Sequence, residues 1–147
     1  MQLIEDDRLF PVDSYGRDLA QELFASVRNL PIFSPHGHTN PAWFAKDEPF
    51  DSPAALFVTA DHYVFRMLYS QGIALEDLGI SPLDGSEVEA NPREIWRRFA
   101  LNYHLFRGTP SRLWIDHSLQ EVFGVDQVLT AKTADTIDDQ IATCLTL

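Results

Sequence analysis

A single short apolar segment limits the folds that are open to this chain. Residues 32–34 (Ile-Phe-Ser) lie between two prolines, and the run is too short for a helix. We interpret it as a buried strand that ends near His36. A lone buried strand cannot satisfy its backbone N–H and C=O groups without a partner strand. We therefore expect that another chain supplies the partner, or that the sequence is part of a longer protein.

The rest of the chain carries the signals of helices. Several segments begin with Asn, Asp, Ser or Thr, often followed by proline. This pattern is typical of a helix N-terminus, because the side chain caps free N–H groups and proline fits the first turn. Gly72 and Gly124 mark helix ends, whereas the last segment has no such glycine, which also suggests a longer protein. We expect helices or helical turns in residues 12–31, 40–47, 52–58, 61–72, 74–80, 91–106 and 109–124, and from Thr130 onward.

Charge and cysteine content narrow the classes of function. The 147 residues carry 11 basic and 22 acidic side chains, a net charge of −11, which disfavours nucleic acid and anionic membranes as partners. Cys144 is the only cysteine, so no internal disulfide can form, and this fits a reducing compartment. The acidic N-terminus does not resemble a signal peptide, and no apolar run approaches the roughly 20 residues of a membrane span. We expect a cytoplasmic protein.

His36 and His38 flank Gly37 at the end of the expected strand. Side chains on a strand alternate between faces, so the two imidazoles point the same way, with positions about 6–7 Å apart. They can bind one divalent ion together, although a catalytic zinc usually has three protein ligands. The same pair of histidines could also be purely structural, because a His-x-His spacing by itself is weak evidence.

The segment 61–72 places polar side chains on one helix face. His62, Arg66 and Tyr69 stand at i, i+4 and i+7. An ordinary amphipathic helix with a solvated polar side explains this pattern. The functional interpretation puts groups suited to proton transfer beside an arginine suited to a carboxylate. Farther along, Arg107 and Arg112 flank a turn between helices, and helix capping accounts for most of that stretch.

Three segments of the chain resemble, in the same order, segments in the N-terminal third of the uronate isomerases, a family of the amidohydrolase superfamily. They are SPHGHTNPAWFAKDEPF, DHYVFRMLYSQG and YHLFRGTPSRLWIDH, and the resemblance extends over essentially the whole chain. It implies the first part of a (β/α)₈ TIM barrel with a helical insertion after strand 1. This chain would then be mostly α with one or two short strands. Residues 1–30 would be a helical extension, 31–38 the first barrel strand and 39–147 the insertion, with the rest of the barrel absent.

The resemblance also implies a reaction and a set of roles. Uronate isomerases interconvert D-glucuronate with D-fructuronate, and D-galacturonate with D-tagaturonate, by proton transfer through a cis-enediol. By resemblance, His36 and His38 are ligands of a divalent metal, expected to be zinc, whose usual third ligand is an aspartate absent from this chain. His62 and Tyr63 would handle the proton, and Arg66 would bind an anionic group of the hexuronate. No nucleotide cofactor is expected, since the chain lacks a glycine-rich dinucleotide motif.

Two alternatives remain open at this point. The chain could belong to another metal-dependent hydrolase of the same superfamily, although such enzymes do not ordinarily carry the second and third segments. It could also be a non-catalytic helical interaction module whose histidines are structural. If the chain is a truncated isomerase, we expect it to be inactive alone and to self-associate, and we expect the parent enzyme to be a homo-oligomer.

Overall fold

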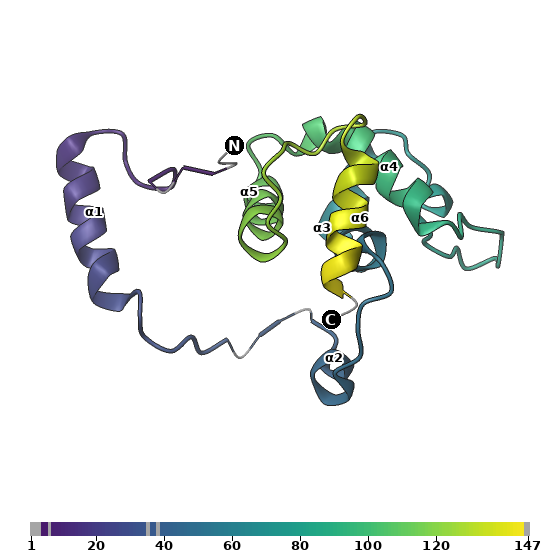
Figure 1. The fold of residues 1–147 in the computed structure, drawn as a ribbon, viewed down its shortest axis with the longest axis horizontal. Helices are drawn as coiled ribbons and strands as arrows, with labels where there is room; N and C mark the ends of the chain where they lie inside the picture. The colour runs from purple at the N-terminus through teal and green to yellow at the C-terminus, as the bar shows by residue number, and fades with distance from the viewer. Residues whose placement is uncertain (1–3, 6, 35, 38, 146–147) are drawn as a thin grey trace. The chain divides into compact units, whose positions relative to one another are not determined.

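The computed structural model describes residues 4–5, 7–34, 36–37 and 39–145 of the chain. Contacts divide them into two compact units, residues 4–48 and residues 49–145. The described residues form helices and turns and contain no strand (Figure 1). In chain order the elements are α1 (Ser14–Val27), α2 (Pro41–Lys46), the π-helix η1 (Ala55–Thr59), α3 (His62–Ser70), the 3₁₀-helix η2 (Glu76–Leu78), α4 (Pro92–Asn102), the 3₁₀-helix η3 (Tyr103–Phe106), α5 (Pro110–His117), the π-helix η4 (Ser118–Val122) and α6 (Ala134–Leu145).

The helix starts follow the local capping chemistry of the sequence. Asp13 caps α1 by accepting a hydrogen bond from the Gly16 N–H at 2.7 Å. Asn40, Asp61, Asn91 and Thr109 do the same for α2, α3, α4 and α5, and proline follows three of these caps. Because a cap removes one free N–H from the first turn, it favours a helix that begins at that residue. The predicted starts of these helices are confirmed.

The larger unit is built around an aromatic core. Phe57 of η1 packs against Trp96 of α4, with ring centroids 6.2 Å apart. Phe99 then contacts Trp96 at 5.4 Å and Tyr103 at 5.2 Å. Trp96, Phe99 and Tyr103 are fully buried, so this stack holds η1, α4 and η3 in one core.

The last helix is tied to α4 by polar contacts. The buried indole N–H of Trp96 donates to the Ala134 carbonyl at 2.9 Å. On the surface, Arg97 binds the Asp135 carboxylate at 2.7 and 2.8 Å. Arg93 pairs with Asp138 at 2.9 Å. These contacts join segments about 40 residues apart and therefore position α6 on α4.

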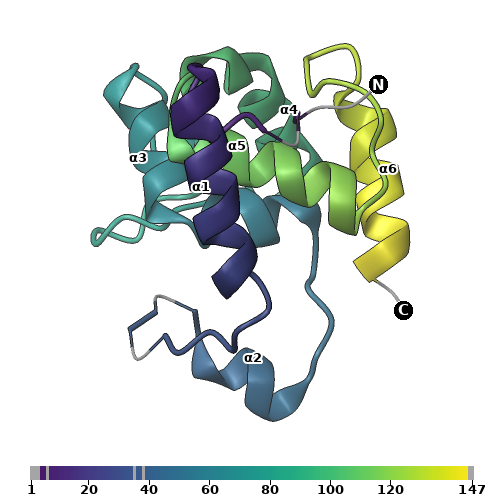
Figure 2. The same ribbon diagram turned by 90° about the vertical axis from the view of Figure 1, so that its left-hand side faces the viewer.

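Two predicted α-helical stretches take a wider π form. The stretch around Pro53 continues as η1, and α5 runs without a break into η4 (Figure 2). π-turns are rare and usually interrupt α-helices at single places, often near functional sites. In this chain η1 packs against both α3 and α4. It also comes directly before α3, the helix that carries the predicted site residues, in the sequence.

The smaller unit differs most from the sequence-based expectation. Ile32 and Phe33 are 93% and 90% exposed, and residues 31–34 and 36–37 form no strand, so the predicted buried strand is wrong for the described residues. A strand needs hydrogen-bond partners on a neighbouring strand, and the described residues provide none. The α1 stripe is present at helical spacing, yet Leu19, Leu23 and Phe24 remain about half exposed.

Among the described residues, no helix is both long enough and apolar enough to span a membrane.

Candidate functional site

The predicted metal ligands fall in the extended segment between α1 and α2. His36 is exposed, and its carbonyl accepts a hydrogen bond from the Ser34 hydroxyl at 2.8 Å. His38 lies outside the described residues. A Cβ added to Gly37 would meet no atom within 4 Å, so the backbone between the two histidines is open. The described part of the chain holds no group of three or more His, Cys, Asp or Glu side chains able to bind a metal. The zinc site therefore stays a prediction.

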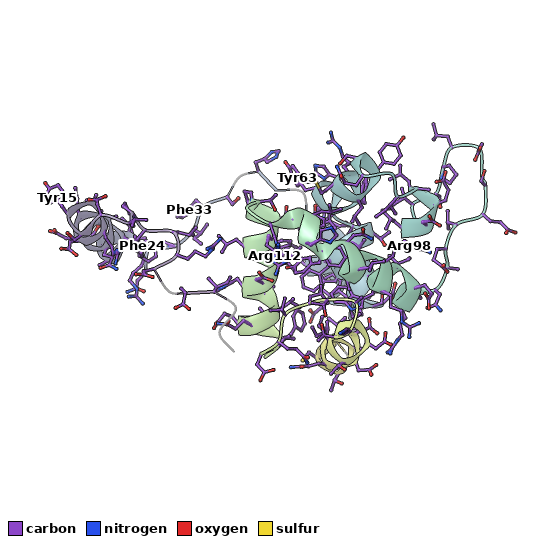
Figure 3. The ribbon with its side chains drawn as sticks, turned by 90° about the horizontal axis from the view of Figure 1, so that it is seen from above. Tyr15, Phe24, Phe33, Tyr63, Arg98 and Arg112 are labelled. Atoms are coloured by element: carbon purple, nitrogen blue, oxygen red, sulfur yellow. The ribbon has the colours of Figure 1, made fainter. Side chains whose placement is uncertain are left out.

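The first turn of α3 brings the two predicted proton-handling residues together. The Asp61 carboxylate accepts a hydrogen bond from the Tyr63 N–H at 2.8 Å, which starts the helix. The rings of His62 and Tyr63 lie 4.3 Å apart between centroids and are inclined by 32°. Tyr63 is 62% exposed, and its side chain is labelled in Figure 3. A half-buried histidine and an exposed tyrosine, two side chains that can carry a proton, therefore form one pair at the surface of α3.

One face of α3 is buried in the core, which leaves the other face toward solvent. Val64 and Leu68 are completely buried in the core. Arg66 follows the His62–Tyr63 pair by one turn, is exposed, and makes no hydrogen bond or ion pair with the described residues. An unpaired guanidinium keeps its fork of N–H donors available for a carboxylate. The structure thus groups His62, Tyr63 and Arg66 on α3, whereas His36 belongs to the other compact unit.

A buried hydrogen-bond network lies next to this helix. The Tyr103 hydroxyl donates to Asp116 Oδ1 at 2.8 Å, and Arg112 Nε donates to Asp116 Oδ2 at 2.6 Å. The Arg112 guanidinium also stacks over the Tyr103 ring, with its central carbon 3.9 Å from the ring centroid. Burial, followed by the negative charge of Asp116, raises the pKa of Tyr103. Tyr103 therefore stays a neutral hydrogen-bond donor at all ordinary pH values.

This network lies in the elements that pack against α3, the helix of the candidate site. It joins η3 to α5, and η3 in turn packs against α3. From the sequence alone, helix capping was the predicted role of the stretch around Arg112, and the network was not predicted. The i, i+4 spacing of Arg112 and Asp116 was a signal for half of it. Nothing local indicated Tyr103, because its contact with Asp116 depends on the turn between two helices.

The chain is similar to known proteins along nearly its whole length. A family model described as glucuronate isomerase matches residues 7–147. The uronate isomerase of Rhizobium meliloti (strain 1021) is 58% identical over 144 residues, which cover 98% of this chain and 31% of that protein. The uronate isomerase of Mesorhizobium japonicum is 56% identical over 143 residues, covering 97% of this chain and 30% of that protein.

Two crystal structures have a similar fold. The glucuronate isomerase from Caulobacter crescentus matches with a TM-score of 0.90 and 46% identity, covering 98% of this chain and 30% of that one. The uronate isomerase from Thermotoga maritima matches with a TM-score of 0.78 and 26% identity, covering 97% of this chain and 29% of that one. The chain spans about three tenths of the length of these relatives. Since the family model matches nearly all of its residues, the chain belongs to the glucuronate isomerase family.

Proposed function

We propose that a whole protein containing this segment interconverts hexuronates, D-glucuronate with D-fructuronate and D-galacturonate with D-tagaturonate. Family membership supports the reaction class. The observation that carries the proposal for this chain is the group of half-buried His62 with exposed Tyr63 and Arg66 on one helix, whose opposite face is buried. The reaction moves hydrogen within a single molecule, so it requires no nucleotide cofactor.

The spacing on α3 suits the length of the substrate. Four residues of helix rise by about 6 Å, which separates His62 from Arg66 along the axis. An open-chain hexuronate has five C–C bonds of about 1.5 Å, and an extended chain of this kind spans roughly 6 Å from C1 to C6. When C1 and C2 lie over the first turn, the C6 carboxylate reaches the turn that carries Arg66. Arg66 would then hold the carboxylate by two charge-assisted hydrogen bonds.

The proton-handling step is assigned to the ring pair. A base removes the proton from C2 of the aldehyde, and the resulting cis-enediol takes a proton at C1 while the C2 hydroxyl becomes the ketone. The proton on the C2 oxygen passes to the C1 oxygen, so atoms balance. We propose His62 or Tyr63 for this role. Both side chains can hold a proton, and their stacking keeps them over the same part of the substrate.

Other parts of the proposal rest on the family resemblance. We propose that His36 and His38 are two ligands of a divalent metal, expected to be zinc, in a segment that becomes the first strand of a TIM barrel only in the whole protein. Imidazole suits such an ion, which would polarise the substrate oxygens when bound. The described residues hold no group of three side chains able to bind a metal, so the remaining ligands would come from other parts of the whole protein. A cytoplasmic location and a homo-oligomeric state are also proposed.

The experiment uses a full-length relative in which these 147 residues replace the matching segment, referred to below as the test enzyme. Purified free of nucleotides, it is expected to convert D-glucuronate to D-fructuronate. A folded test enzyme that converts neither hexuronate, or that strictly requires NAD, would contradict the proposal.

Substitution of Arg66 tests the assigned carboxylate contact. Hydrogen bonds to a charged group contribute about 1.5–3 kcal/mol, so Arg66→Met should raise KM for D-glucuronate by roughly ten- to a hundredfold. Arg8→Met, which removes another exposed arginine, is the matched control and should leave KM unchanged. An unchanged KM in Arg66→Met would assign Arg66 a structural role.

A further inference from the structure

The proposed function gives no role to one polar side chain of α3, that of Tyr69. Tyr69 is 59% exposed, and its phenol hydroxyl forms no hydrogen bond with the described residues. Tyr103, by contrast, is buried and donates its hydroxyl to Asp116 at 2.8 Å. The Tyr69 hydroxyl is therefore available to a ligand that approaches this face.

Helix geometry places Tyr69 with the proposed substrate contacts. At 100° per residue, Arg66 and Tyr69 lie within about 40° of His62 around the helix axis. The buried residues Val64 and Leu68 lie on the opposite side, about 160–120° away. Half-buried His62 and the exposed residues Arg66 and Tyr69 thus form a single row along the helix, opposite its buried face.

The position of Tyr69 along this row determines which part of the substrate it meets. Tyr69 stands about 10 Å beyond His62 along the axis, one turn past Arg66. Helical side chains lean toward the N-terminus, so the ring of Tyr69 is expected over the turn that carries Arg66. An open-chain hexuronate of roughly 6 Å ends at that turn with its carboxylate.

We propose that Tyr69 is a substrate-binding residue at the carboxylate end of the site. Its phenol O–H donates to a carboxylate oxygen that Arg66 also holds, and this contact favours hexuronates over neutral hexoses. The inference rests on the proposed function and extends it to Tyr69, which was first considered only as a group suited to proton transfer.

The test measures KM, kcat and, by calorimetry, the Kd of D-glucuronate in the test enzyme. Tyr69→Phe removes only the hydroxyl and should raise KM and Kd by about tenfold while kcat stays within about twofold. Any weak turnover of D-glucose should not change, since that sugar has no carboxylate. In the double variant with Arg66→Met, KM should rise by less than the product of the two single-variant increases, because both residues hold the same carboxylate.

The control is Tyr15→Phe, the same change at a tyrosine of α1 that is 80% exposed, and it should alter neither constant. Thermal midpoints of all variants should agree, which separates binding from folding. Unchanged KM and Kd in Tyr69→Phe, or effects that multiply fully in the double variant, would overturn the role of Tyr69 alone. If the unsubstituted test enzyme neither binds nor converts D-glucuronate, both this inference and the proposed function are refuted.

Discussion

Replacement of Tyr103 by phenylalanine tests how much the buried network stabilises the larger unit. The change removes one hydroxyl from a fully buried ring and keeps the contacts of that ring with Phe99. Asp116 loses the donor to Oδ1 at 2.8 Å and keeps the Arg112 donor to Oδ2 at 2.6 Å. A carboxylate that is 9% exposed cannot regain the lost bond fully from water.

The expected loss follows from the nature of the acceptor. A hydrogen bond to a charged group contributes about 1.5–3 kcal/mol, and leaving a buried acceptor without its partner incurs a desolvation penalty of similar size. We expect Tyr103→Phe to lower the free energy of unfolding by about 2 kcal/mol. The total free energy of unfolding of a domain is roughly 5–15 kcal/mol, so the expected loss is a substantial fraction of it.

Urea unfolding followed by tryptophan fluorescence measures the effect, because buried Trp96 reports on the core. With a slope of about 2 kcal/mol/M, the midpoint should fall by roughly 1 M. Tyr69→Phe is the matched control, since it removes the same hydroxyl from a half-exposed ring that has no hydrogen-bond partner in the described structure. Its midpoint should shift by no more than about 0.3 M.

A double-variant cycle separates the pair from the rest of the network. If the Tyr103–Asp116 hydrogen bond causes the loss, Tyr103→Phe should cost much less in an Asp116→Ala background, where no side-chain acceptor remains, than in the original protein. A midpoint shift below about 0.3 M for Tyr103→Phe, or full additivity with Asp116→Ala, would refute the reasoning.

Two further predictions concern charge and backbone conformation. The hydrogen bonds from Arg97 lower the pKa of Asp135 from its ordinary value of 3.8. The stabilising effect of the Asp135 carboxylate is therefore present above pH 3.8 and is lost as the pH falls through the folded-state pKa. Asp135→Asn should lower the thermal midpoint at about pH 6, this shift should shrink as the pH falls below 3.8, and an equal shift at every pH would contradict the reasoning. Gly79 has a φ of +74°, and an added Cβ would lie 2.8 Å from Ile95 Cδ1, whereas Gly72 has a φ of +90° and open space around it. Gly79→Ala should cost roughly 2–4 kcal/mol and Gly72→Ala about 1–2 kcal/mol in urea unfolding, and equal losses would exclude steric overlap as the cause.

The amino-acid sequence by itself determined where most helices begin. Asp61 and Asn91 cap their helices through hydrogen bonds that reach only two residues along the chain. Because donor and acceptor are close in sequence, such a cap can be predicted without knowledge of the fold. The same holds for the exposed α3 face, since alternation of buried and exposed residues along a helix depends on a fixed period. The family resemblance rested on such segments and is confirmed.

Tertiary structure decided the features that depend on distant partners. The expected strand at 31–38 did not form in the described residues, because strand hydrogen bonds require a second strand that no local pattern can supply. Trp96 donates a hydrogen bond to Ala134, which lies 38 positions away in the chain. Tyr103 donates a hydrogen bond to Asp116 across a turn between two helices. Such contacts arise when separate helices pack into one core, and packing follows from shape and volume that a sequence period does not encode.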